Sequence, residues 1–290
     1  MKRREFVKYT AATAGALTLS PFANIFADEV KKKNANDIVT LGKTGIKVSR
    51  LAMGTGTHGV NRSSNQTRGL GVKGVGELLN YAYSKGINFW DSADQYGTHP
   101  HLKEALKTIP REKVVILTKT TANSAKDLNA DLDRFRKEIG TDYIDIILIH
   151  LMTDPKWTEK KQGVMEALSK AREDGIIRAH GVSCHSLGAL ETAADSDWVQ
   201  VDMARINPFG SAMDADVPTV EKVLKRMHDK GKGIIGMKVF GGGRLRDKVD
   251  ECLNYVLGLE FVHSMTIGQE NQNELNDLLK RIPAQSIASK

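Results

Sequence analysis

Cysteine is scarce in this sequence, which holds Cys184 and Cys252 among its 290 residues. Two thiols build neither a disulfide framework nor a cysteine-based metal site. The chain also lacks a basic stripe with interleaved aromatic residues, so we expect no nucleic-acid partner. What is left is an ordinary globular composition, 40% hydrophobic and 27% charged. Its length accommodates one large α/β domain or two smaller ones.

Part of the formal net charge of +7 lies in residues 1–27, where four basic residues face one acidic residue. Arg3-Arg4, then Phe6, precede a modestly apolar run over 9–19, an order that resembles a twin-arginine export signal. The run is short for a membrane span, and no other stretch is long or apolar enough. The sequence thus predicts a signal over 1–27, a linker over 28–37 and export to the periplasm by the twin-arginine machinery. We expect no stable membrane span after processing, although an uncleaved signal would leave the protein tethered.

Apolar strand patterns and amphipathic helix patterns alternate over the remaining residues, 38–290. The segment opens with a hairpin signal, in which two alternating runs, 38–41 and 46–48, flank a glycine-bounded turn. The strands expected after it are Leu51–Met53, Ile87–Trp90, Val114–Leu117, Ile144–Ile149, Ala179–Val182, Val199–Met203, Ile234–Met237 and Phe261–Ile267. The expected helices lie near 75–85, 99–107, 124–139, 158–174, 186–194, 217–230, 246–257 and 272–281. Eight such pairs predict an α/β fold, a (β/α)8 TIM barrel with the N-terminal hairpin capping its bottom.

A doubly wound parallel sheet is the competing fold for alternating strands and helices. That fold would place a glycine fingerprint directly after its first strand. Here Gly54, Gly56 and Gly59 do have the fingerprint spacing, but the acidic residue after the next strand, Asp91, lies too far along the chain for the matching role. The barrel is therefore favoured.

Ionisable residues follow three successive strands of the predicted barrel, at the end where barrel enzymes carry their chemistry. The second strand leads into Asp91 and then Tyr96, the third ends at Lys119, and the fourth ends at His150. Any one of these alone would be better explained as a snorkelling or internally paired side chain. Burying four separately is costly, so we expect them to pair with one another at one rim.

Several motifs together resemble the aldo-keto reductase family. They are Leu41–Gly45 through Leu51–Gly56, Gly86–Gly97, Ile116–Lys119, Thr141–His150 and Gly181–Ser183. The resemblance runs from about residue 38 to the end and is strongest in the first half. It implies a barrel that binds NADP or NAD across its mouth and reduces an aldehyde or ketone, or oxidises the alcohol.

The chemistry implied by this resemblance assigns a role to each of the four residues. Tyr96 is the general acid that protonates the carbonyl oxygen, and a free phenol with a pKa of about 10 is a weak acid for that purpose. Lys119 beside it is expected to lower the phenol pKa, and Asp91 to hold Lys119 by an ion pair. His150 orients the carbonyl oxygen by a hydrogen bond. No metal is required.

Cofactor contacts carry over from the family less evenly. Ser183 and Gln200 match carboxamide partners, Cys184 stands where relatives have asparagine, and Met237 replaces a stacking tyrosine. The implied cofactor residues are Gly54, Thr55, Asp91, Ser183, Cys184, Gln200, Met237, Lys238, Phe240, Gly241, Gly268 and Gln269. Relatives bind the 2′-phosphate of NADP with basic residues after the last strand, whereas this chain has Glu274 there. We therefore expect weaker discrimination against NAD.

Other features leave alternatives open. Gly69–Gly76, His58 and the loop His99–His101 flank the expected mouth, and solvated loops explain them better than a direct role. A metal-dependent barrel hydrolase would want a His-x-His pair on the first strand, but the pair His99 and His101 follows the second. A non-catalytic redox sensor on the same fold is a further rival, and so is an exported enzyme that keeps its cofactor trapped. The substrate and the oligomeric state are not predicted.

Overall fold

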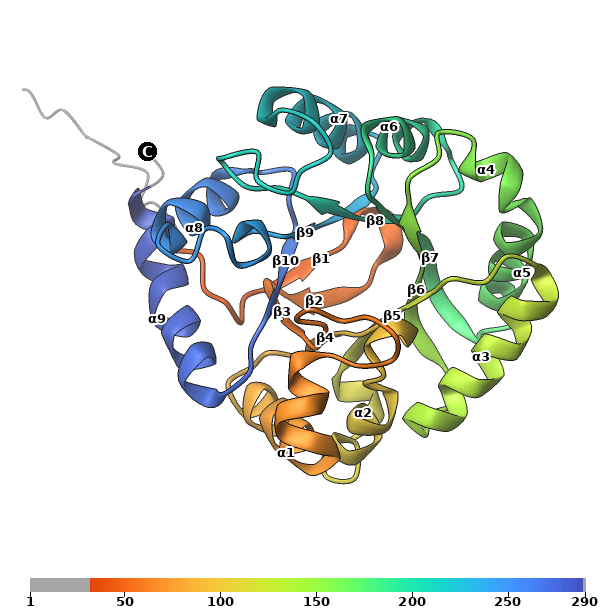
Figure 1. The fold of residues 1–290 in the computed structure, drawn as a ribbon, viewed down its shortest axis with the longest axis horizontal. Helices are drawn as coiled ribbons and strands as arrows, with labels where there is room; N and C mark the ends of the chain where they lie inside the picture. Colours follow the sequence, from red (N-terminus) through yellow and green to blue (C-terminus); the bar gives the residue numbers. More distant parts are fainter. Residues whose placement is uncertain (1–31, 289–290) are drawn as a thin grey trace, which may run out of the picture. The chain divides into compact units, whose positions relative to one another are not determined.

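Eight parallel strands close into a barrel in the computed structural model, which describes residues 32–288. The strands are β3 Leu51–Gly54, β4 Phe89–Asp91, β5 Val115–Thr120, β6 Ile144–Met152, β7 Ile177–Cys184, β8 Val201–Arg205, β9 Gly233–Met237 and β10 Ser264–Gly268. They follow one another in chain order, and β10 pairs in parallel with β3 to close the ring. Figure 1 looks along this barrel. The (β/α)8 fold expected from the sequence is confirmed.

Helices surround the barrel in a ring (Figure 1). They are α1 Asn65–Ser84, α2 His99–Ala105, α3 Ala125–Ile139, α4 Trp157–Lys160, α5 Gln162–Glu173, α6 Leu187–Asp195, α7 Val217–Asp229, α8 Val249–Gly258 and α9 Gln272–Ala288. Four single-turn 3-10 helices join them: η1 Gly42–Thr44, η2 Asp94–Tyr96, η3 Arg111–Lys113 and η4 Gly241–Gly243. Every expected helix has a counterpart, and the region predicted as 158–174 is divided into α4 and α5.

The predicted hairpin is present and closes the amino-terminal end of the barrel. Strands β1 Ile38–Thr40 and β2 Lys47–Ser49 pair antiparallel around η1. Three of its apolar side chains, Leu41, Ile46 and Val48, are buried in the cluster that fills the barrel interior. The backbone N–H of Lys43 donates to the carbonyl of Gly231, just before β9, at 2.8 Å. The hairpin thus lies at the end of the barrel opposite the mouth.

Helix α1 begins ten residues earlier than its sequence pattern predicted. Ser64 caps it by accepting from the N–H of Thr67, and the Thr67 hydroxyl accepts from the N–H of Ser64 in return. The glycine-rich stretch 69–76 is therefore helix rather than loop. The one break is Gly71, whose φ of 62° and ψ of −175° kink the helix, a conformation that glycine adopts at little cost. Local capping outweighed the low helix propensity of the glycines.

The apolar spacing, the capping residue and the terminal glycine of helix α3 explain why this segment is helical. Its buried residues, Leu128, Leu132, Phe135 and Ile139, recur at helical spacing and cover β5 and β6 with one apolar stripe. Ser124 caps the first turn by accepting from the N–H of Asp127 at 3.1 Å. Gly140 ends the helix with a φ of 77°. The opposite face is charged, and part of it faces the active-site turn described below.

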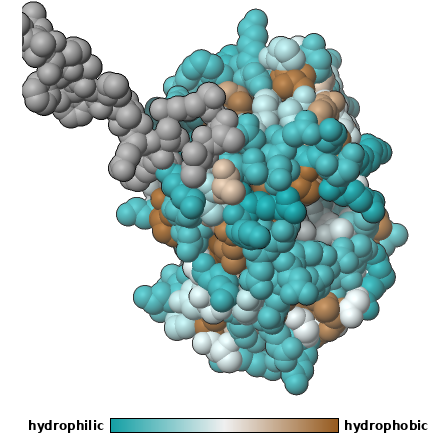
Figure 2. Space-filling model, turned by 90° about the vertical axis from the view of Figure 1, so that its left-hand side faces the viewer, coloured by the Kyte–Doolittle hydropathy of each residue, from teal (hydrophilic) through white to brown (hydrophobic). Residues whose placement is uncertain are grey.

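Among the described residues, regular structure begins at β1, directly after the predicted linker, and ends with α9. Of residues 28–37, the structure describes 32–37, and Ala35 among them is buried in the core. The predicted signal at 1–27 lies outside the described residues. Figure 2 shows a largely hydrophilic face with small scattered apolar groups. Among residues 32–288, none of the helices has the length and apolar character that a bilayer crossing demands.

Candidate active site

The four residues predicted to pair do meet at the mouth of the barrel. The ammonium of Lys119 is hydrogen-bonded to Oδ1 of Asp91 and donates to the carbonyl of Ser92 at 2.8 Å. Its Nζ also lies 4.8 Å from the centre of the Tyr96 ring. The rings of Tyr96 and His150 meet edge to face with centres 5.9 Å apart. Lys119 is 1% exposed, so this cation is held by its partners and not by water.

A short turn after β4 delivers Tyr96 to this group. The single turn η2 ends at Gly97, whose φ of 66° reverses the chain. The loop after β3 packs on the tyrosine ring: a Cβ added at Gly56 or Gly59 would fall 2.2 or 2.3 Å from ring atoms of Tyr96. Only glycine allows the backbone to lie so close to the ring. The loop and the turn therefore form one packed unit around the phenol.

The phenol of Tyr96 is not more acidic than usual in this structure. Burial raises its pKa above the ordinary value of 10.0, and Asp91 adds to that effect. Lys119 lowers the pKa by its charge and by a hydrogen bond, as the sequence predicted, but burial outweighs it. Tyr96 is therefore protonated at neutral pH, the form that a proton donor needs.

The two neighbouring bases are shifted in opposite directions. Burial lowers the pKa of Lys119, but the charge of Asp91 and the hydrogen bonds with Asp91 and Tyr96 raise it by more, and the net change is upward. Burial and the nearby cation of Lys119 lower the pKa of His150 to about 2. Lys119 is thus a permanent cation and His150 a neutral imidazole across the physiological range. A neutral imidazole is able to donate or accept one hydrogen bond at the mouth.

Five of the predicted cofactor residues lie on the mouth side of the barrel. Gly54 ends β3, and Thr55 donates its hydroxyl to the carbonyl of Asp91 at 2.8 Å. The Ser183 hydroxyl accepts from the N–H of Leu151, next to His150, at 3.1 Å. Met237 ends β9 inside the barrel, and Gly268 ends β10. Hydrogen bonds within the protein thus fix the backbone around the mouth without the help of a ligand.

Gln200 was wrongly assigned to the cofactor. It precedes β8 at the closed end of the barrel, where its carbonyl accepts from the N–H of Gly233 at 2.8 Å. Its side-chain oxygen accepts from the N–H of His180 at 3.2 Å. Strand β8 runs two residues further than predicted, to Arg205. The polar residue at its mouth end is therefore Arg205, and Gln200 lies at the wrong end.

Cys184 was also misplaced by the sequence comparison. It is fully buried in the cluster between strands and helices, because side chains alternate along β7 and Ala179 already faces inward. Its thiol lies beside the carboxyl of Asp202, and burial raises the pKa of the thiol well above 9.0. A residue in this layer does not line the mouth.

The segments after β9 and β10 carry the remaining predicted cofactor residues. Lys238 is exposed and has a φ of 55°, and Gly241 packs against Ser211. Phe240 is partly buried and packs against the outer core. Gln269 is fully buried, and neither atom of its amide finds a hydrogen-bond partner within residues 32–288. That unpaired amide is available to a ligand.

Two functional contacts were missed from the sequence. The hydroxyl of Thr266 in β10 donates to Oδ2 of Asp91 at 2.8 Å, a contact that exists only because the barrel closes and that no local pattern signals. Arg205 is paired with the buried carboxylate of Asp214 at the mouth end of β8. Arg205 could have been found from the sequence, because a charged residue that ends an apolar strand is the pattern that identified Lys119 and His150.

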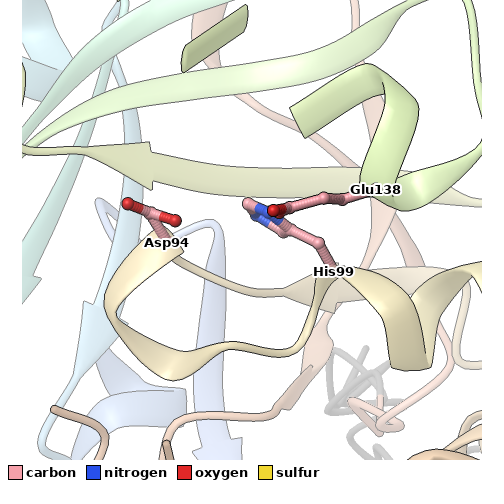
Figure 3. A group of neighbouring side chains, drawn as sticks. All are labelled: Asp94, His99 and Glu138. Carbon is pink, nitrogen blue, oxygen red and sulfur yellow. The ribbon is translucent and has the colours of Figure 1, made fainter. Parts of the chain in front are cut away.

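A group of side chains beside the mouth has the composition of a metal site. Asp94, His99 and Glu138 bring ligand atoms within 4.8 Å of one another (Figure 3). Contrary to the expectation from the sequence, His99 and His101 are not residues of a solvated loop, because both are buried in the first turn of α2. Two guanidinium groups, those of Arg62 and Arg134, already bond both carboxylates. We therefore interpret the group as an ion-pair network.

The sequence is similar to those of several known oxidoreductases. The chain is 29% identical over 182 residues to "Probable aldo-keto reductase 1" of Glycine max, covering 53% of this chain and 50% of that one. It is 23% identical over 224 residues to D-threo-aldose 1-dehydrogenase of a Pseudomonas species, covering 65% and 66%. The chain therefore spans between half and two thirds of these relatives. The NADH-specific methylglyoxal reductase of Escherichia coli is 28% identical over 266 residues, covering 84% and 78%.

Solved structures agree with the fold. A putative aldo-keto reductase from Pseudomonas aeruginosa superposes with a TM-score of 0.72 at 22% identity, covering 90% of this chain and 99% of that one. A family model of known proteins, described as the Aldo/keto reductase family, matches residues 51–282, which include every strand of the barrel. This chain belongs to the aldo/keto reductase family.

Proposed function

We propose that this protein is an NAD(P)-dependent oxidoreductase that reduces an aldehyde or ketone, or oxidises the corresponding alcohol. The observation that carries the proposal is the position of the Lys119 ammonium between the carboxylate of Asp91 and the ring of Tyr96. Burying a cation between a carboxylate and a protonated phenol costs stability and has little purpose in a structural core. Its presence therefore points to a function.

Tyr96 acts as the general acid. Its protonated phenol donates to the carbonyl oxygen as negative charge develops there, and the Lys119 cation stabilises the phenolate that remains. Asp91 fixes Lys119, and Thr266 in turn fixes Asp91. The neutral His150 directs a hydrogen bond at the same oxygen and orients the substrate. In the reverse direction the phenolate accepts the proton of the alcohol.

The residues beyond β9 and β10 fit a dinucleotide cofactor. The unpaired buried amide of Gln269 offers a donor and an acceptor. At Gly242 and Gly243 an added Cβ would have no neighbour closer than 4.0 Å, and the nearest atoms belong to the cations Lys238 and Arg246. Open backbone beside cations suits a pyrophosphate. The cofactor supplies or accepts the hydride when bound, and Gln269, Lys238 and this glycine run would hold it.

Turnover of a carbonyl panel with NADH and NADPH tests the proposal, and Tyr96→Phe is the decisive variant. Loss of the general acid should lower kcat by about 10² to 10⁴-fold while cofactor binding persists. Thermal unfolding serves as the control for folding. A wild-type protein that binds the cofactor but turns over no carbonyl or alcohol would instead support the non-catalytic sensor.

Glu274 supports acceptance of NAD. Its carboxylate accepts from the N–H of Glu270 at 2.8 Å and from the Asn271 side chain at 3.0 Å, at the start of α9. A carboxylate in this place repels a 2′-phosphate, and two relatives carry NADH or NAD/NADP in their names. We expect competition binding to show Kd values within about tenfold of each other, since the repulsion is partly screened. A strong preference for NADPH would contradict this.

Export to the periplasm by the twin-arginine route is proposed from residues 1–27, whose order of charges and apolar residues supports it. That route carries folded proteins, which suits an enzyme that acquires a soluble cofactor first. Cell fractionation of the full chain should find it in the periplasm, and substituting both Arg3 and Arg4 by lysine should retain it in the cytoplasm. Equal distribution of the two versions would refute the signal.

A further inference from the structure

The turn that carries Tyr96 is bonded to helix α3 on both sides of the tyrosine. Two residues before Tyr96, both carboxylate oxygens of Asp94 accept from the guanidinium of Arg134, at 2.7 and 3.0 Å. Three residues after it, Nδ1 of His99 lies 2.9 Å from the carboxylate of Glu138. Arg134 and Glu138 are one helical turn apart on α3 and lie 3.4 Å from each other. Figure 3 shows His99 and Glu138 in contact, with Asp94 facing them.

The same network reaches the strand that carries Lys119, on both sides of that lysine. One residue before Lys119, the hydroxyl of Thr118 lies 2.7 Å from Nε2 of His99. One residue after it, the hydroxyl of Thr120 donates to Asp131 of α3 at 2.6 Å. Asp131 also accepts from Arg134 at 2.7 Å. The network therefore spans both the proton donor's turn and the cation's strand.

A third segment joins the same network. Arg62, from the loop whose glycines pack on the Tyr96 ring, donates to Glu138 at 2.7 Å and lies 3.5 Å from Asp94. The carbonyl of Arg62 would be 2.0 Å from a Cβ at Gly97, at the end of the tyrosine turn. Loop, turn and helix are thus fixed together around Tyr96.

The carboxylates of the network already have cationic partners. The guanidinium groups of Arg62 and Arg134 face the carboxylates of Asp94, Glu138 and Asp131. The hydrogen bond from His99 is the main cause that lowers the pKa of Glu138 to about 2. Nδ1 of His99 lies against Glu138 and Nε2 against Thr118, so both ring nitrogens have a partner. A metal ion would have to displace these bonds.

We propose that Arg134 and Glu138, acting through Asp94 and His99, are positioning residues that fix the phenol of Tyr96 relative to Lys119. The inference rests on the proposed reductase function. Proton transfer in the transition state is sensitive to displacements of about 1 Å. An ion-pair network that is mostly screened from water holds such a distance better than exposed pairs do.

Arg134→Met is the first test, with Arg136→Met as its matched control. Arg136 lies on the same helix and donates to Leu132 and Asp133 of α3 and to the carbonyl of Asp142 in the loop that follows. Its loss should therefore leave kcat unchanged. Arg134→Met should lower kcat about tenfold or more, with the Kd of the cofactor unchanged. Because Tyr96 would move away from Lys119, the alkaline limb of the kcat profile should shift to higher pH. If the variant merely had a smaller folded fraction, kcat would be lower by the same factor at every pH and the profile would not shift.

Two further variants separate positioning from general stability. Arg134→Lys keeps a cation and should recover part of the lost kcat. In a Tyr96→Phe background, Arg134→Met should cause no further loss, because both changes act through the same phenol. Losses that multiply in the double variant, or an Arg134→Met protein as active as Arg136→Met, would overturn the inference while leaving the proposed function intact. A wild-type protein without activity would overturn both.

Discussion

At the scale of single residues, the site is defined by what burial does to charges. Tyr96, Lys119 and His150 are each shifted so that the phenol and the ammonium are protonated and the imidazole is neutral at physiological pH. These are the forms that donation of a proton to a carbonyl requires. The shifts depend on side chains from three strands, so none of them follows from an isolated sequence motif.

Asp202 gives a pH-dependent prediction at the same scale. Its carboxyl is fully buried, and burial raises its pKa from 3.8 to about 7, against a lowering effect of the neighbouring Cys184 thiol. The folded protein therefore holds a proton that the unfolded chain releases. Stability contributed by this group is complete below about pH 4 and is lost as the pH rises toward about 7, on the order of 4 kcal/mol in all.

Asp202→Asn removes that titration. From about pH 4 to about pH 8, the free energy of unfolding of the variant should rise relative to the wild type by several kcal/mol. Urea unfolding of both proteins at a series of pH values measures the difference. The comparison is matched, since all other groups titrate in both proteins. A difference that stays constant with pH would contradict the prediction.

At the scale of elements, the loop after β3 controls the position of Tyr96. Gly59 has no room for a Cβ, which would lie 2.3 Å from the tyrosine ring. Gly59→Ala should therefore displace the ring and lower kcat about tenfold to a hundredfold. Gly69→Ala in α1 is the control, because a Cβ there meets nothing within 4 Å. Steady-state kinetics and thermal unfolding of both variants separate an effect on the ring from an effect on folding.

Helix α3 shows that an element can serve the site without entering it. Arg134 of α3 is bonded to Asp94 in the turn of Tyr96, and Glu138 of α3 is bonded to His99 just after that turn. The candidate residues Asp91, Lys119 and His150 lie near the mouth ends of strands, as in other barrels. The outer helix is bonded to the turn that connects β4 to α2. An exposed charged face of a surface helix is usually solvated, and here part of it is structural.

At the scale of the whole molecule, stability and activity are assigned to opposite ends of the barrel. Leu41 of the hairpin is fully buried at the closed end. Leu41→Ala should cost about 2–5 kcal/mol of stability with kcat and KM unchanged at a temperature where the protein is folded. Leu70→Ala, at a position that is 36% exposed, is the control and should cost little. A changed KM in Leu41→Ala would show that the two ends are coupled.

The sequence by itself determined the alternation of strands and helices, the hairpin and the residues that end the second, third and fourth strands. These are local signals: periodicity marks elements, and a charge that ends an apolar run marks a strand end. The same signal would have found Arg205 had β8 been extended by two residues. The sequence did not predict that α1 extends through its glycines. The cap and the packing of the second half of the helix, and not helix propensity, determine where it begins.

Only the tertiary structure decided which end of the barrel each residue occupies and which way it faces. Gln200 and Cys184 looked equivalent to cofactor residues in the sequence, yet one lies at the closed end and the other faces the outer core. Thr266 reaches Asp91 only because β10 closes on β3. Contacts between residues distant in sequence depend on closure and register, since a shift of one residue in a strand reverses the direction of every side chain.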